Sequence, residues 1–165
     1  MRELENILIA TMGKPDTGKL ELVNQFFNNR IRYTTDIEAW GVKEYWATPN
    51  ELVKCGVGDC EDFAIAKYFT LRESGVGDDK LKIVYGKLIT TGEAHMVLCY
   101  DETFILDNRV DKIMTVADRS DFVQIIGFNC SGIWTFKRGK IKQTTRNSKR
   151  LIKWREFQER MNGGI

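Results

Sequence analysis

Residues 58–69 read Gly-Asp-Cys-Glu-Asp-Phe-Ala-Ile-Ala-Lys-Tyr-Phe, a polar turn that runs directly into an apolar helical pattern. Asp59 is of the residue type that caps helix N-termini, and Gly75 is of the type that ends helices. The stretch therefore predicts a helix from Cys60 to about Ser74, with Cys60 in its first turn.

Further helices are predicted before this segment. Apolar residues recur at helical spacing over 4–12 and again over 20–31. An aromatic-rich stretch over 33–47 reads as a loop. Residues 48–51, Thr-Pro-Asn-Glu, then form a capping box with a proline at the first helical position, which predicts a short helix.

Strand-like runs follow the helices. They lie at residues 81–89, 94–100, 103–106, 123–128 and 133–136. Helices first and strands afterwards favour an α+β fold, with the N-terminal helices packed on one face of an antiparallel β-sheet.

Length and composition indicate one globular domain. The chain has 165 residues, close to the roughly 150 of a typical domain, so residues 1–165 are read as a single domain. Hydrophobic residues make up 42% and charged residues 29%, which suits a folded interior. The longest apolar runs are far shorter than the roughly 20 residues of a membrane span, so we expect a protein that is not inserted in a membrane. No signal peptide is recognisable at the start, which is compatible with the cytosol or with a mature periplasmic form.

The charge is unevenly distributed along the chain. Nine of the 25 Lys and Arg residues fall in 137–155 with no acid, which leaves 16 basic and 23 acidic residues elsewhere. We therefore expect a basic C-terminal helical tail over about 137–165, with an amphipathic helix at 148–161 that docks on the body. Only Trp154 offers a stacking ring in the basic run and no nucleic-acid-binding motif is present, so no nucleic-acid partner is predicted.

One motif resembles a phosphate-binding loop. Residues 13–19, Gly-Lys-Pro-Asp-Thr-Gly-Lys, fit the GxxxxGK frame. The next residue, Leu20, lacks the hydroxyl that such a loop offers to magnesium. We interpret the segment as a glycine-containing turn between two helices.

Cys60 is a candidate nucleophile. At the first turn of a helix, a cysteine faces unpaired N–H groups and the positive end of the helix dipole, which favour the thiolate. The alternative is a small buried residue with no chemical role. The chain has four cysteines without a CxxC pair and a single histidine, His95, which excludes HExxH and Cys2His2 metal sites.

His95 and Asp107 are the candidate base and its orienting partner. His95 lies near the start of one strand-like run and Asp107 closes the next. In a hairpin centred on Asp101 the two residues would lie directly opposite each other, with Cβ atoms about 4.5–5.5 Å apart. An aspartate there can hold one imidazole nitrogen while the other takes the proton of a cysteine. The alternative is a core histidine beside a turn aspartate.

Several blocks of sequence together carry a family resemblance. They are residues 23–28, 36, 40–41, 45–49, 58–69, 94–98 and 106–108. Over roughly residues 20–135 the chain resembles the bacterial transglutaminase-like cysteine proteinases, the LapG-type periplasmic proteases. The resemblance implies a papain-like or transglutaminase-like core, with Cys60 as nucleophile, His95 as base and Asp107 as orienting residue.

The resemblance also implies a cofactor, a substrate and a partner. Members of the family need calcium and cut a large surface adhesin near its N-terminus, at a pair of alanines, which releases the adhesin and disperses biofilm. An inner-membrane cyclic di-GMP receptor (LapD-type) sequesters them. Carried onto this chain, the calcium ligands would be Asp59, Glu61 and Asp62, although these acids also suit a helix cap.

Two other functions are compatible with the same residues. The same three residue types serve amide chemistry without proteolysis in transglutaminases and acyltransferases. A catalytically silent, calcium-dependent binding module would keep the acids and lose the reactivity of Cys60.

Overall fold

Residues 2–163 are described by the structure, a computed structural model of the chain. The helices are α1 (Arg2–Thr11), α2 (Asp16–Arg30), α3 (Asp36–Trp40), α4 (Pro49–Cys55), α5 (Cys60–Glu73) and α6 (Ile152–Gly163), with 3-10 turns at Asp78–Lys80 and Ser148–Arg150. The strands are β1 (Arg32–Tyr33), β2 (Val57–Gly58), β3 (Leu81–Leu88), β4 (Ala94–Tyr100), β5 (Phe104–Leu106), β6 (Met114–Thr115), β7 (Phe122–Asn129), β8 (Gly132–Lys137) and β9 (Lys140–Thr145).

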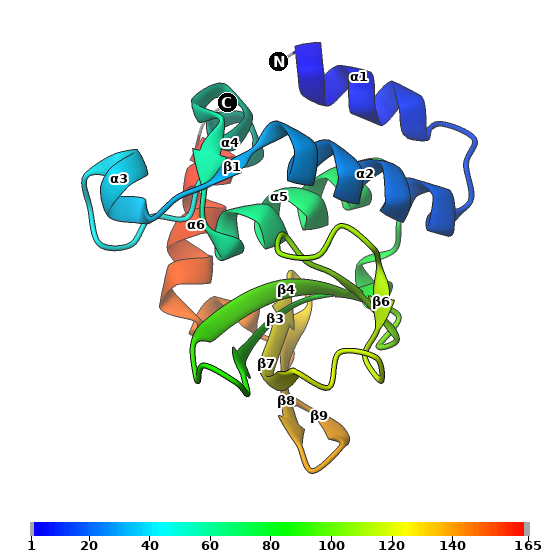
Figure 1. The fold of residues 1–165 in the computed structure, drawn as a ribbon, viewed down its shortest axis with the longest axis vertical. Helices are drawn as coiled ribbons and strands as arrows, with labels where there is room; N and C mark the ends of the chain where they lie inside the picture. Colours follow the sequence, from blue (N-terminus) through cyan, green and yellow to red (C-terminus); the bar gives the residue numbers. More distant parts are fainter. Residues whose placement is uncertain (1, 164–165) are drawn as a thin grey trace.

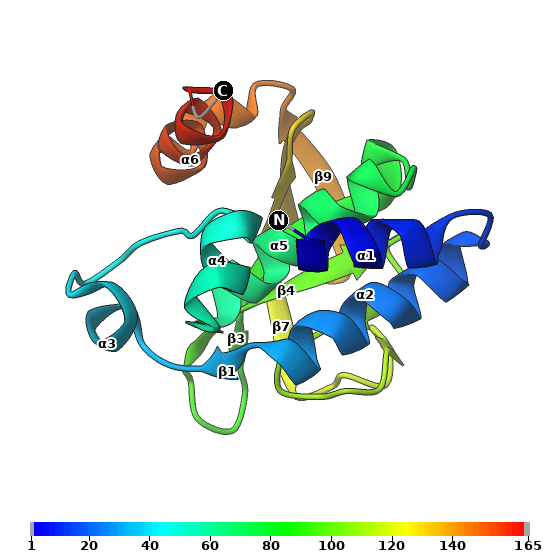
Figure 2. The same cartoon turned by 90° about the horizontal axis from the view of Figure 1, so that it is seen from above.

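The main sheet has seven antiparallel strands in the order β6-β5-β4-β3-β7-β8-β9. Helices α1, α2 and α5 lie over one side of it, with α5 nearer to the sheet (Figure 1). Seen from above, α1 and α2 run side by side and α3 projects away from this layer (Figure 2). The predicted α+β fold, with N-terminal helices on an antiparallel sheet, is confirmed.

The core explains why α5 lies at the centre. Residues 62–68 of α5 are buried around the whole circumference of the helix, because α2 covers one side and the sheet covers the other. Phe27 of α2, Leu71 of α5 and Leu98 of β4 are each 0% exposed in the same apolar cluster. Burial on this scale fixes the helix that begins at Cys60 relative to the strand that carries His95.

Most local predictions hold. The 48–51 capping box forms, with the Glu51 N–H donating to Thr48 Oγ1 at 3.3 Å and the Thr48 N–H donating to Glu51 Oε2 at 2.8 Å. Gly13 adopts φ +69° between α1 and α2, and Leu20 is 2% exposed in the core. The GxxxxGK frame therefore begins in the turn between the two helices, and its residues 16–19 form the start of α2. The stretch over 33–47 is not entirely loop, since it includes α3.

The basic tail differs from the prediction. It is not helical from about 137, because Lys140–Thr145 forms the edge strand β9 and α6 begins only at Ile152. A turn at Arg138 and Gly139, both with positive φ, folds β9 back onto β8. All but one residue of β9 are exposed, so the strand lacks the apolar alternation that identifies strands in sequence.

The docking of the tail helix is confirmed. Trp154 and Phe157 of α6 are 0% exposed and stack with ring centroids 5.5 Å apart. Trp154 also donates from Nε1 to the carbonyl of Asn129 at 3.2 Å. Over residues 2–163, the structure has no helix with the length and apolar character needed to cross a membrane.

Candidate active site

Cys60 is the first residue of α5, directly after a constrained turn. The carboxylate of Asp62 accepts from the N–H of Ala47 at 2.7 Å and from the N–H of Asp59 at 3.3 Å, which fixes the turn and the helix start together. A Cβ on Gly58 would lie 2.5 Å from a methyl carbon of Leu52, so only glycine fits there. The sequence Gly-Asp-Cys-x-Asp therefore sets the direction in which the chain enters α5.

His95 and Asp107 form a buried pair. His95 Nε2 lies 2.8 Å from Asp107 Oδ1, and the two residues are 1% and 2% exposed. The hairpin register differs from the prediction, because Tyr100 pairs with Phe104 and the turn is centred on Glu102 rather than Asp101. The resulting two-residue shift keeps His95 and Asp107 on one face of the sheet, where diagonal neighbours still meet.

Three donors hold the carboxylate of Asp107. Besides His95, the N–H of Arg109 donates to Oδ1 at 3.0 Å and Arg119 Nη1 donates to Oδ2 at 2.7 Å. Burial alone would raise the pKa of Asp107, but the hydrogen bonds from His95, Arg109 and Arg119 outweigh it and lower the pKa to about 2. Asp107 is therefore ionised at neutral pH. Arg119 lies between β6 and β7 and is 4% exposed, and no pattern in the sequence marks it as a partner of Asp107.

This pairing selects one tautomer of His95. A carboxylate can only accept, so the ring nitrogen that faces it, Nε2, carries the proton. The other nitrogen, Nδ1, is buried and has no hydrogen-bond partner among residues 2–163. Nδ1 is thus the atom available to take up a proton.

Cys60 and His95 line one pocket. The pocket has a volume of about 280 Å³ and is also lined by Trp46, Tyr85 and Met96. The Cys60 thiol donates to Glu61 Oε2 at 3.1 Å. Burial and the neighbouring Glu61 carboxylate raise the pKa of the thiol, so Cys60 is protonated in this arrangement. The thiolate requires that the negative charge beside it be offset.

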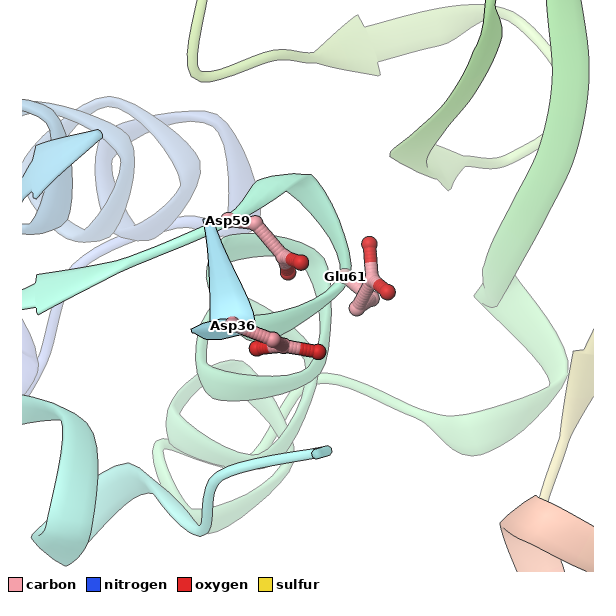
Figure 3. Close-up of side chains that lie close together, drawn as sticks. All are labelled: Asp36, Asp59 and Glu61. Atoms are coloured by element: carbon pink, nitrogen blue, oxygen red, sulfur yellow. The ribbon is translucent and has the colours of Figure 1, made fainter. Parts of the chain in front are cut away.

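Three carboxylates gather beside the nucleophile. Asp36, Asp59 and Glu61 each offer an oxygen within 4.8 Å of the others, and Figure 3 shows their side chains converging. Oδ1 of Asp36 and Oδ1 of Asp59 are buried, and no hydrogen-bond partner lies within the described part of the chain. Burial, together with Glu61 and Asp62, raises the pKa of Asp59 to about 9. Orphaned, mutually repelling carboxylate oxygens are the donor set that suits a hard divalent cation.

The predicted ligand set is only partly brought together. Asp59 and Glu61 belong to the cluster, whereas both oxygens of Asp62 are engaged by the Ala47 and Asp59 amides. Asp36 is the third carboxylate of the cluster. It is distant in sequence from Asp59 and Glu61, and the parallel pairing of Tyr33 with Gly58 brings it to the start of α5. Such a pairing of two-residue strands leaves no periodic signal in the sequence.

Comparison with known proteins finds a matching family model and similar solved structures. Residues 5–136 match the family model described as bacterial transglutaminase-like cysteine proteinase. LapG of Legionella pneumophila treated with EGTA is 39% identical, covers 96% of this chain and 86% of its own, and superimposes with a TM-score of 0.85. The calcium-bound form of the same protein gives 39% identity, 96% and 87% coverage, and a TM-score of 0.82. None of the curated proteins matches.

Proposed function

Because the chain belongs to the bacterial transglutaminase-like cysteine proteinase family, we propose that it is a calcium-dependent cysteine endopeptidase whose catalytic residues are Cys60, His95 and Asp107. The observation that carries this proposal is the buried His95–Asp107 pair, which leaves Nδ1 of the imidazole without a hydrogen-bond partner among residues 2–163, in a histidine that lines the same pocket as Cys60. A histidine that served only the core would have no reason to keep a buried nitrogen unpaired.

The three residues take complementary roles in peptide hydrolysis. Cys60 Sγ attacks the scissile carbonyl carbon while His95 Nδ1 takes up the thiol proton. The imidazolium then delivers this proton to the leaving amine, and water hydrolyses the thioester. Asp107 stabilises the imidazolium and holds the ring in place. The backbone N–H of Cys60, at the start of α5, is the donor that we assign to the oxyanion.

Asp36, Asp59 and Glu61 are the residues that would hold calcium. A calcium ion held there would supply positive charge that offsets the carboxylates beside Cys60. Supporting this assignment are the orphaned oxygens of Asp36 and Asp59 and the calcium-bound form of Legionella LapG. Asp62, the remaining acid of the turn, accepts a hydrogen bond from the N–H of Asp59 and so fixes the backbone of this ligand.

The proposal extends to a substrate and a partner by analogy with the family. We assign to this chain a large surface adhesin, cut near its N-terminus at a pair of alanines, with biofilm dispersal as the consequence. Regulation would come from sequestration by an inner-membrane cyclic di-GMP receptor (LapD-type), and the enzyme would act in the periplasm. The identity of 39% with LapG over 96% of the chain supports this assignment.

Incubation with an N-terminal adhesin fragment tests the proposal. The wild type should cut the fragment with calcium present and stop when a chelator is added. Cys60→Ala should be inactive, while Cys55→Ala, a change at an exposed cysteine, should retain activity. Transfer of an added amine without hydrolysis would indicate an acyltransferase, and calcium binding without any turnover would indicate a binding module.

A further inference from the structure

A buried lysine lies on the nucleophile helix, outside the site described so far. Lys67 is 0% exposed and follows Cys60 by about two turns of α5. Its Nζ donates to Oδ1 of Asn24 at 2.8 Å and to Oδ1 of Asn28 at 2.7 Å, both from α2. The ion pairs found among residues 2–163 do not include Lys67. The ammonium is therefore held by neutral amides.

The two asparagines lead from this ammonium to the catalytic aspartate. Asn28 Nδ2 donates to the backbone carbonyl of Asp107 at 2.9 Å and to Oδ1 of Asp111 at 3.1 Å. Asn24 Nδ2 donates to the backbone carbonyl of Asp111 at 2.9 Å. Each amide thus receives from Lys67 on its oxygen side and donates to the 107–111 segment on its nitrogen side.

An ammonium in this position is costly. Burial lowers the pKa of Lys67 to about 7, and only the more distant charges of Asp107 and Asp111 oppose that shift. A leucine or methionine would fill the same apolar space between α2 and α5 at lower cost. What an apolar residue cannot do is fix the orientation of an amide group. The lysine amine has at least two N–H donors in either protonation state, so it holds both asparagine oxygens toward itself and both NH2 groups toward the 107–111 segment.

We propose that Lys67, Asn24 and Asn28 form a clamp that positions Asp107 against His95. The three are positioning residues, since none touches the reacting atoms. Because Lys67 and Cys60 share one rigid helix, the clamp ties the segment that carries Asp107 to the helix that carries the nucleophile. This inference rests on the proposed function for its consequence in catalysis, and its structural part can be tested without substrate.

The single histidine of the chain makes a direct test possible. In 15N-histidine-labelled, calcium-loaded protein at pH 8, the wild type should show His95 as the Nε2–H tautomer. Lys67→Met should shift the nitrogen resonances toward a mixture of tautomers. It should also lower kcat on the adhesin fragment by roughly 10–100-fold with KM unchanged, as expected for a displacement of about 1 Å.

Asn28→Asp separates positioning from charge burial. The new carboxylate keeps an acceptor for Lys67 but loses the donor to the Asp107 carbonyl and repels Asp111. We expect thermal stability close to that of the wild type and the same change in His95 resonances and kcat as in Lys67→Met. If Lys67→Met fails to fold, the His95 resonances and the kcat of Asn28→Asp test the proposal in its place.

Lys82→Met is the matched control. Lys82 is also buried, at 6% exposure, and its Nζ pairs with Glu102 at 3.0 Å, away from the 107–111 segment. Its loss should lower Tm and leave the His95 resonances unchanged. The proposal is overturned if Lys67→Met and Asn28→Asp also leave the His95 resonances unchanged. Wild-type protein that shows the Nε2–H tautomer but no cleavage would instead refute the proposed function.

Discussion

Asp107→Asn is the substitution for which the surroundings dictate the outcome most clearly. The carboxylate accepts on Oδ1 from His95 and Arg109 and on Oδ2 from Arg119. An asparagine has a single oxygen, so it can satisfy only one of these sides. If the oxygen faces Arg119, the NH2 group faces Nε2 of His95 and the N–H of Arg109. His95 must then accept at Nε2 and carry its proton on Nδ1, the atom that has to receive the proton of Cys60.

Both stability and activity should fall. Removing one partner of a buried ion pair lowers the free energy of unfolding by roughly 3–5 kcal/mol. The lower end applies because Arg119 retains its hydrogen bond to Asp121 at 2.9 Å. The wrong tautomer and the loss of the charge that stabilises the imidazolium together should lower kcat by about 10³–10⁴, or roughly 4–5.5 kcal/mol of transition-state stabilisation. KM should change little, because Asp107 does not line the pocket.

Urea unfolding and steady-state cleavage of the adhesin fragment measure the two effects. Asp121→Asn is the matched control, because it also removes a carboxylate from Arg119 but leaves the contact with His95 intact. It should cost under about 1 kcal/mol, since Asp121 is half exposed, and keep kcat within a factor of about three. Asp107→Asn combined with Arg119→Met should recover part of kcat, since the asparagine oxygen is then free to accept from His95. An Asp107→Asn enzyme with nearly wild-type kcat would refute this reading of the site.

Further predictions concern the acidic turn. Calcium at about 100 times its dissociation constant should stabilise the wild type by about 2.7 kcal/mol, seen as a rise in Tm of roughly 5–10 °C, and Asp36→Asn should abolish most of that rise. In protein treated with a chelator, Tm should fall as the pH rises from 5 to 8. Burial raises the pKa of Asp59 to about 9 and that of Asp62 to about 7, so the folded state keeps protons that an unfolded carboxyl of pKa 3.8 has released. The stability that is fully present below pH 3.8 is therefore lost as the pH rises. Calcium should flatten this profile, and a profile equally steep with calcium would contradict the proposed ligands. Asp62→Ala should cost roughly 1–3 kcal/mol for each of the Ala47 and Asp59 amides that it leaves unpaired, measured by urea unfolding, and a cost near zero would show that water replaces the carboxylate.

Local signals in the sequence were sufficient for the helices that present the nucleophile. The turn before Cys60, the box at 48–51 and the apolar spacing of α1 and α2 each depend on residues within a few positions of one another. Local geometry of this kind is set by capping and burial, which leave a readable pattern. The alternation of the strands likewise placed His95 and Asp107 on one face although the exact register was not foreseen.

Contacts between residues far apart in the chain could not be predicted from the sequence. Asp36 joins Asp59 only through the pairing of β1 with β2, and Arg119 reaches Asp107 from the segment between β6 and β7. Lys67 reads in sequence as a polar residue in a helix, and nothing local shows that it is buried. Each of these contacts is decided by how the elements pack, and a lone charged residue in a sequence is far more often exposed than buried.

The reactivity of Cys60 relative to Cys55 is the direct test of whether Cys60 is a nucleophile activated by His95. Cys55 is exposed and lies five residues away, so it reports ordinary thiol chemistry in the same molecule. Calcium-loaded protein is treated with limiting iodoacetamide near pH 7, and the modification of each cysteine is quantified by mass spectrometry. We expect Cys60 to react faster than Cys55, cleavage to be lost in proportion, and His95→Ala to slow the reaction of Cys60 alone. If Cys60 reacts no faster than Cys55 and its rate does not depend on His95, Cys60 is not a nucleophile activated by His95.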